Sequence, residues 1–212
     1  MSKIISLIRV LWSTPSIKPK RIAIVQGHPD IDTKHFGHTL AEIYKKSAEA
    51  AGHEVKLIEV AKLKFPFLTS KNEFESSIFP NAIQQSQEII RWAEHLVIIY
   101  PLWLGTMPAI LKAFFEQTFR PGFAFSYSGS NGMPKKLLVG KSARIIVTMG
   151  MPAFIYRWYF RAHGLKNLKR NILSFCGVHP LKDSLIGMIE SHNNTHREKW
   201  LAKMHELGQQ GK

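Results

Sequence analysis

The chain has 212 residues, of which 45% are hydrophobic, and it carries a formal net charge of +14. This length fits one domain with a sizeable core, and the single cysteine, Cys176, excludes a disulfide framework and a thiolate zinc site and favours a reducing compartment. No stretch approaches the roughly 18 consecutive apolar residues of a membrane-spanning helix, so we expect a chain that is soluble or at most peripheral. Together with the reducing compartment, this predicts a cytoplasmic protein.

Residues 1–19 differ from the rest of the chain. Apolar residues there mix with Lys3 and Arg9, and prolines interrupt the end of the segment. It lacks the small-residue cleavage site of a secretory signal, so we treat it as an extension of a single domain at 20–212. Two interpretations stay open: an amphipathic helix peripheral to the inner face of the membrane, or a segment that packs on its own fold or a partner.

The remaining elements alternate between buried strands and helices along the chain. The hydrophobic pattern predicts a strand at 22–25, a helix at 36–51 ended by Gly52, a strand at 55–60, a looser stretch at 61–80, a helix at 81–93, a strand at 96–100, a helix at 108–119, a long excursion at 120–140, a strand at 143–148, a helical region at 153–175, a strand at 181–189 and a final helix at 194–207. Excursions as long as 120–140 are typical of lids and binding loops.

Five such βα units imply a parallel sheet with helices on both faces. Five strands in about 190 residues fit the flavodoxin-like order 2-1-3-4-5, an α/β/α sandwich of three layers, better than a six-stranded Rossmann sheet. The loop at 26–30 contains neither the G-x-G-x-x-G fingerprint nor a phosphate-loop pattern. In the flavodoxin-like order, the first and third strands flank the switch point at which ligands bind.

The third predicted strand leads into an aromatic loop and then into a helix opened by Pro108. The segment 100–116 reads YPLWLGTMPAILKAFFE. Because Trp103 and its neighbours follow the carboxyl end of a strand, they are placed to form a wall against a planar ligand. A loop aromatic that only caps the sheet is the alternative interpretation.

Three motifs together resemble the NAD(P)H:quinone oxidoreductases of the flavodoxin-like superfamily: QGHP at 26–29 with Phe36, the segment 100–116, and GFAF at 122–125. The chain looks like a bacterial member, of the type that also supplies ancillary subunits to potassium-efflux systems, over about residues 20–208. The resemblance implies a homodimer, a flavin (FMN or FAD), and ping-pong hydride transfer of two electrons from NAD(P)H to quinones or similar electrophilic aromatics.

The resemblance also implies which residues contact the flavin. They fall in three loops: His28, Thr33, Lys34, His35 and Phe36 on the phosphate and ribityl side; Pro101, Leu102, Trp103 and Leu104 along the ring edge; and Thr148, Met149, Gly150 and Met151 on the pyrimidine side. A helix N-terminus stabilises an anion, which suits the first loop. His28 is otherwise a turn residue before a proline. Met151 stands where the family has glycine, so its side chain can block a close approach.

Family members place a Tyr and a His after the third loop, where they stabilise charge during hydride transfer. Tyr156 and His163 are the candidates, and Tyr159 competes with Tyr156. An aromatic run at helical spacing also fits a core or a subunit interface. Trp103, Phe125 and Tyr127 are expected to wall the slot that the nicotinamide and the quinone share.

The net charge of +14 raises further possible binding functions. Basic residues are densest at Arg157, Arg161, Lys166, Lys169, Arg170 and Lys182, a zone that suits phosphates, anionic lipid or an anionic cofactor. No nucleic-acid-binding signature accompanies it, so nucleic acid is not expected. The rival function is a flavin-binding regulatory or ancillary subunit of a membrane transporter with little turnover of its own, docked through residues 1–19.

Overall fold

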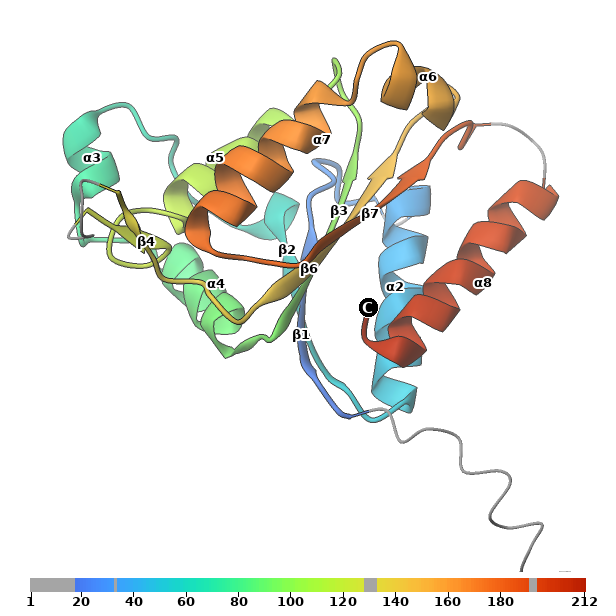
Figure 1. Ribbon diagram of the computed structural model, residues 1–212, viewed down its shortest axis with the longest axis horizontal. Helices are drawn as coiled ribbons and strands as arrows, with labels where there is room; N and C mark the ends of the chain where they lie inside the picture. The colour runs from blue at the N-terminus through green and yellow to red at the C-terminus, as the bar shows by residue number, and fades with distance from the viewer. Residues whose placement is uncertain (1–17, 33, 128–132, 191–193) are drawn as a thin grey trace, which may run out of the picture.

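A five-stranded parallel sheet in the order β2-β1-β3-β6-β7 forms the centre of the molecule (Figure 1). Its strands are β1 (Arg21–Gln26), β2 (Glu54–Glu59), β3 (His95–Pro101), β6 (Ser142–Thr148) and β7 (Leu181–Ile186). Numbered along the chain, this is the order 2-1-3-4-5, so the predicted flavodoxin-like topology is confirmed. β3 is buried along its whole length, as expected for a continuous apolar run at the centre of a parallel sheet.

The computed structural model describes residues 18–32, 34–127, 133–190 and 194–212. The expectations for Thr33 and for nearly all of the extension at 1–19 therefore fall outside the described residues. In the described part of the chain, no helix is long and apolar enough to cross a membrane. Cys176 is buried, and burial raises the pKa of its thiol to about 12.

Helices cover both faces of the sheet (Figure 1). On one face lie α2 (Phe36–Ala50) and α8 (Asn194–Gln210), and on the other lie α4 (Asn81–Trp92), α5 (Ala109–Thr118) and α7 (His163–Asn167). In α2 the buried positions Leu40, Tyr44 and Ala48 recur every four residues and therefore form one apolar face. These helices and the sheet make up the three layers of the predicted sandwich.

The region predicted as one helix at 153–175 is divided. It contains α6 (Ala153–Trp158), α7 and a π-helical stretch, η3 (Leu168–Ser174). Arg161 and Ala162 lie between α6 and α7 with φ of 53° and 48°, a left-handed conformation that no helix continues through. The break turns the chain back, since the Ala162 N–H donates to the Tyr156 carbonyl at 3.0 Å.

Three other stretches contain more, or less, regular structure than predicted. The looser stretch at 61–80 contains the end of η1 (Val60–Lys62) and a short helix, α3 (Lys71–Glu75), and the excursion at 120–140 contains a hairpin of β4 (Phe125–Ser126) and β5 (Lys135–Lys136). The strand predicted at 181–189 ends at Ile186. Beyond it the chain leaves the sheet, because the Met188 N–H donates to the Met151 carbonyl at 3.2 Å instead of continuing the ladder.

Candidate active site

The three predicted cofactor loops meet at the carboxyl edge of the sheet. Single backbone hydrogen bonds extend the ladder just beyond the strand ends: Gly27 N–H to the Ile99 carbonyl at 2.7 Å, Leu102 N–H to the Thr148 carbonyl at 2.7 Å, and Met149 N–H to the Ile186 carbonyl at 2.8 Å. The fold therefore brings these loops together and fixes their backbones before any ligand is bound.

The first loop is organised by the buried side chain of Gln26. Its amide nitrogen donates to the Gly37 carbonyl at 2.9 Å, and its amide oxygen accepts from the His28 N–H at 3.1 Å. Both interactions are buried, so they are sheltered from competition with water. Gln26 thus joins the end of β1 to the first turn of α2.

Three imidazoles gather around Asp30 at the start of α2. The ring of His28 stacks on that of His35 with centroids 4.2 Å apart, and the ring of His38 lies 5.3 Å from His28. The Asp30 N–H donates to His28 Nδ1 at 3.1 Å, and the Asp30 carboxylate lies 3.0 Å from His35 Nε2. Burial, and secondarily the neighbouring His35, lower the pKa of His28, which favours its neutral imidazole.

The beginning of α2 suits an anion. His35 occupies the N-cap without a side-chain capping bond, and the first turn carries no acidic residue. The first N–H groups of the helix therefore lie at its positive end without a side-chain cap, where an anion is stabilised. Lys34 is exposed beside them, and the Arg197 guanidinium lies 4.6 Å from the Phe36 ring. This donor set fits the phosphate of a flavin nucleotide.

The second loop is a tight two-residue turn. Trp103 and Thr106 exchange both backbone hydrogen bonds, at 2.9 and 3.0 Å, and the residues between them have φ of 46° (Leu104) and 82° (Gly105). Left-handed conformation at both central positions is the hairpin geometry that favours Asn-Gly, so Leu104 is strained by about 1 kcal/mol. Its side chain is fully exposed and Trp103 is half exposed, which leaves both available to a ligand or a partner.

Tyr156 and Gly164 hold this turn in place from behind. The Tyr156 hydroxyl donates to the Gly105 carbonyl at 3.3 Å and accepts from the Leu165 N–H at 3.1 Å. A Cβ at Gly164 would lie 2.3 Å from the Gly105 carbonyl oxygen, so only glycine allows α7 to approach. Tyr156 is 1% exposed, and burial raises its pKa.

The other two candidates for catalysis are accessible. His163 is exposed at the first position of α7, next to the residue that packs on the turn, and Tyr159 is 80% exposed. His163 is thus exposed and adjacent in sequence to the glycine that packs on the turn. Tyr156 reaches the site through its contact with the turn.

In the third loop, Thr148 and Met149 are buried, whereas Gly150 and Met151 are exposed. The chain after β7 runs beside this loop, with the Ile189 N–H donating to the Met149 carbonyl at 3.3 Å. The Met149 side chain belongs to the core, and its N–H and carbonyl pair with Ile186 and Ile189, so Met149 fixes the backbone of the loop. Met151 is 37% exposed at the position of the family's second glycine.

Phe125 and Tyr127 do not join Trp103 within one chain. The Trp103 turn precedes α5, whereas β4 follows it, so the two regions lie at opposite ends of that helix (Figure 1). Ten helical residues span about 15 Å. The Phe125 ring packs instead on Phe175, with centroids 5.0 Å apart.

Several residues that build the site were not among the predicted ones. His38 had a usable signal, since it follows His35 by three residues and therefore lies on the same helical face. Gln26, Asp30 and Gly164 act through side-chain or packing contacts that depend on the folded chain, and no sequence pattern points to those contacts.

Comparison with known proteins decides the family. The sequence matches the Flavodoxin-like fold family over residues 20–207. The chain belongs to this family. It is similar to an uncharacterized NAD(P)H oxidoreductase of Haemophilus influenzae, 27% identical over 170 residues that cover 78% of this chain and 83% of that protein.

Two further likenesses are informative. The crystal structure of an NAD(P)H:quinone oxidoreductase from Methanothermobacter marburgensis superimposes with a TM-score of 0.79 at 21% identity, covering 92% of this chain and 100% of that one, and shows the shared fold. The glutathione-regulated potassium-efflux system ancillary protein KefG of Cronobacter sakazakii is 27% identical over 132 residues, covering 57% of this chain and 68% of that protein. The family resemblance predicted from the motifs is confirmed.

Proposed function

We propose that this flavodoxin-like protein is a flavin-dependent oxidoreductase of the NAD(P)H dehydrogenase (quinone) type. The observation that carries the proposal is the meeting of three loops at one sheet edge, with the uncapped start of α2 in the first and the Trp103 turn in the second. A bound flavin, FMN or FAD, supplies hydride acceptance from NAD(P)H and two-electron reduction of a quinone or similar aromatic, in a ping-pong sequence.

Each loop has a separate task in binding. The backbone donors at His35 and Phe36 and the Lys34 ammonium would hold the phosphate, with His28 closing the turn behind them and Thr33 remaining a prediction. Pro101, Leu102, Trp103 and Leu104 would border the ring edge. Thr148, Met149, Gly150 and Met151 would border its pyrimidine side through backbone groups.

The charge that develops during reduction needs a donor close to the third loop. His163 is exposed on α7 and would donate a hydrogen bond there. Tyr156 would keep the Trp103 turn and the start of α7 at a fixed separation through its two hydrogen bonds. In the proposed mechanism His163 is the catalytic residue, and Tyr156 contributes by positioning.

A homodimer would complete the slot. The Trp103 turn precedes α5 whereas Phe125 and Tyr127 follow it, so a second copy would supply these two residues to the Trp103 turn of the first. Leu104 and Tyr159 are an exposed apolar and an exposed aromatic residue that such an interface would cover. The shared slot would then exclude water from both sides.

The alternative is a flavin-binding ancillary subunit with little turnover of its own. The similarity to the potassium-efflux ancillary protein favours it. In that case residues 1–19 would contact a transporter or the inner face of the membrane. The primary proposal places the protein in the cytoplasm and assigns it no nucleic-acid partner.

Turnover measurements separate these functions. Purified full-length protein is saturated with FMN or with FAD, its visible spectrum is recorded anaerobically, NADH or NADPH is added, and a water-soluble quinone follows. We expect bleaching by the nucleotide, recovery with the quinone, and steady-state turnover. Flavin that is bound and reduced without quinone-stimulated turnover would favour the ancillary subunit, and failure to bind either flavin would refute both.

A further inference from the structure

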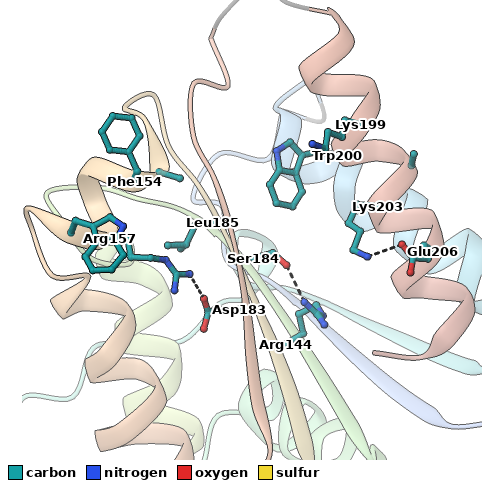
Figure 2. A pocket seen from close by; sticks show the side chains of 13 residues that line it. Arg144, Phe154, Arg157, Asp183, Ser184, Leu185, Lys199, Trp200, Lys203 and Glu206 are labelled. Atoms are coloured by element: carbon teal, nitrogen blue, oxygen red, sulfur yellow. Dashed lines mark hydrogen bonds and ion pairs between the residues drawn. The ribbon is translucent and has the colours of Figure 1, made fainter.

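A cavity of about 830 Å³ lies along the outer edge of β7, between α6 and α8 (Figure 2). β7 is the last strand in the sheet order and pairs with β6 on its inner side. The volume falls in the range of small-molecule sites, about 300–1,000 Å³. None of the residues that line the cavity belongs to the three flavin loops.

The innermost charge in this cavity is a buried arginine. Arg144 on β6 is 7% exposed, and its guanidinium bonds to the Ser184 hydroxyl, with Nη1 donating to Oγ at 3.0 Å. Among the described residues, its Nε has no hydrogen-bond partner and no carboxylate lies within 4.0 Å of it. A buried cation without a counter-ion is costly, so this position favours an anion.

The other cations that line the cavity differ in whether they form an ion pair with a carboxylate. Arg157 bonds to the Asp183 carboxylate at 2.8 Å, and Lys203 bonds to Glu206 at 2.7 Å (Figure 2). Lys199 has no ion pair among the described residues. With the two carboxylates neutralised in this way, Arg144 and Lys199 leave the cavity with an excess of positive charge.

Aromatic side chains form the walls. Trp200 on α8 lies on one side, and Phe154 on α6 lies on the other, with Leu185 between them at the strand edge (Figure 2). Trp158 lines the same cavity and is 78% exposed. Such surfaces bind flat apolar groups, and the adjacent cations favour an acidic substituent on them.

We propose that this cavity is a second ligand site, separate from the flavin loops, for an organic anion with a planar aromatic body. A carboxylate of the ligand pairs with the Arg144 guanidinium and accepts from the Ser184 hydroxyl. The aromatic body lies between Trp200 and the α6 side chains, and Lys199 and Lys203 border the opening. The site does not depend on the proposed reductase function.

Calorimetric titration of the full-length protein tests the assignment, with 2-naphthoate as the probe and 2-naphthalenemethanol as its neutral analogue. Each titration is performed with and without saturating FMN. We expect one naphthoate per chain in both conditions and at least tenfold weaker binding of the alcohol. Equal affinity for the two probes, or loss of naphthoate binding when FMN is added, would overturn the proposal.

Variants locate the bound probe. Arg144→Met removes the buried cation and should weaken naphthoate binding at least tenfold, and the exposed changes Trp158→Ala and Lys203→Met, which should fold even if the first does not, should weaken it about threefold or more. Lys46→Met on α2, which removes a 73% exposed charge outside the cavity, is the matched control and should bind normally. Loss of binding in Trp103→Ala with retention in the cavity variants would place the probe at the flavin slot and refute the site.

Discussion

At the scale of single residues, the Tyr156 hydroxyl makes a contact whose loss can be measured. Tyr156→Phe removes the partner of the buried Leu165 N–H and one bond to the Gly105 carbonyl. Leaving a buried donor unpaired costs about 1–3 kcal/mol. We expect urea unfolding to show a free energy of unfolding lower by about that amount. Quinone reduction should fall because the Trp103 turn is less well positioned.

Tyr159→Phe is the matched control for this change, because Tyr159 is exposed and should tolerate loss of its hydroxyl without a change in stability. If Tyr156→Phe keeps full stability but loses turnover, Tyr156 acts directly in the reaction and the positioning role is wrong.

His95 gives a pH-dependent prediction outside the site. It is 4% exposed and its Nδ1 lies 2.7 Å from the Ser142 hydroxyl, and burial, followed by the charge of Lys20, lowers its pKa from 6.5 to about 3. As the pH falls below 6.5, the unfolded chain takes up the proton first, so stability is lost between about pH 6.5 and 3. Above pH 6.5 the residue has no effect on the pH dependence.

Stability measured in urea at pH 7.5 and 5.5 checks this sign. Wild type should lose about 1.4 kcal/mol more than His95→Asn over this interval, since one pKa unit corresponds to about 1.4 kcal/mol. Asn keeps a hydrogen-bonding group near Ser142, and the remaining histidines titrate in both proteins. An equal loss in both would show that His95 is protonated in the folded state.

Among the site residues, the sequence could predict those whose position follows from the end of a strand. His28 and Trp103 follow predicted strands of a parallel sheet, and the carboxyl ends of such strands share one edge. Gln26 and Asp30 could not be foreseen, because their roles depend on where an amide or a carboxylate finds a partner after folding. The burial of Tyr156 was likewise hidden, because an aromatic run suits both a core and a site.

At the scale of elements, the contact between α7 and the Trp103 turn depends on one missing side chain. In Gly164→Ala the new Cβ would meet the Gly105 carbonyl oxygen at 2.3 Å and the Thr106 Cα at 2.7 Å. Because both are backbone atoms, α7 must move away, at a cost of about 1–3 kcal/mol. We expect lower stability in urea and weaker flavin binding by fluorescence titration.

Gly37→Ala is the stability control for that variant. The added methyl would have Ile99 Cγ2 as its nearest neighbour, at 3.9 Å, and alanine favours a helix by about 0.5–1 kcal/mol, so α2 should become more stable. Equal effects of the two alanines on unfolding would show that the approach at Gly164 is not tight.

Strands were easier to predict than the helices after β6. β1, β3 and β6 are buried at nearly every position and their central residues are mostly apolar, a pattern that fits burial on both faces of a parallel sheet. The division of 153–175 depends on left-handed conformations at Arg161 and Ala162, neither of which favours that region. A tertiary requirement, the return of the chain toward Tyr156, outweighs local preference there.

At the scale of the whole molecule, the separation of Trp103 from Tyr127 makes the proposed homodimer testable by complementation. If the slot combines Trp103 of one copy with Tyr127 of the other, Trp103→Ala and Tyr127→Ala should each lose most quinone reductase activity as homodimers. A mixed dimer would then hold one intact slot and one with both defects. Because each mixed dimer keeps one of its two slots, mixed dimers isolated through two different tags should show about half of the wild-type activity.

The measurement is steady-state NAD(P)H oxidation with quinone, on dimers purified through two different tags, and sedimentation gives the oligomeric state. Coexpression of Trp103→Ala with the double variant Trp103→Ala/Tyr127→Ala leaves no intact slot, so it controls for recovery by coexpression alone. Slots built within one chain would give no restoration in either mixture, because every mixed dimer would carry one defect in each. Restoration only in the first mixture therefore requires Tyr127 to act on the partner copy.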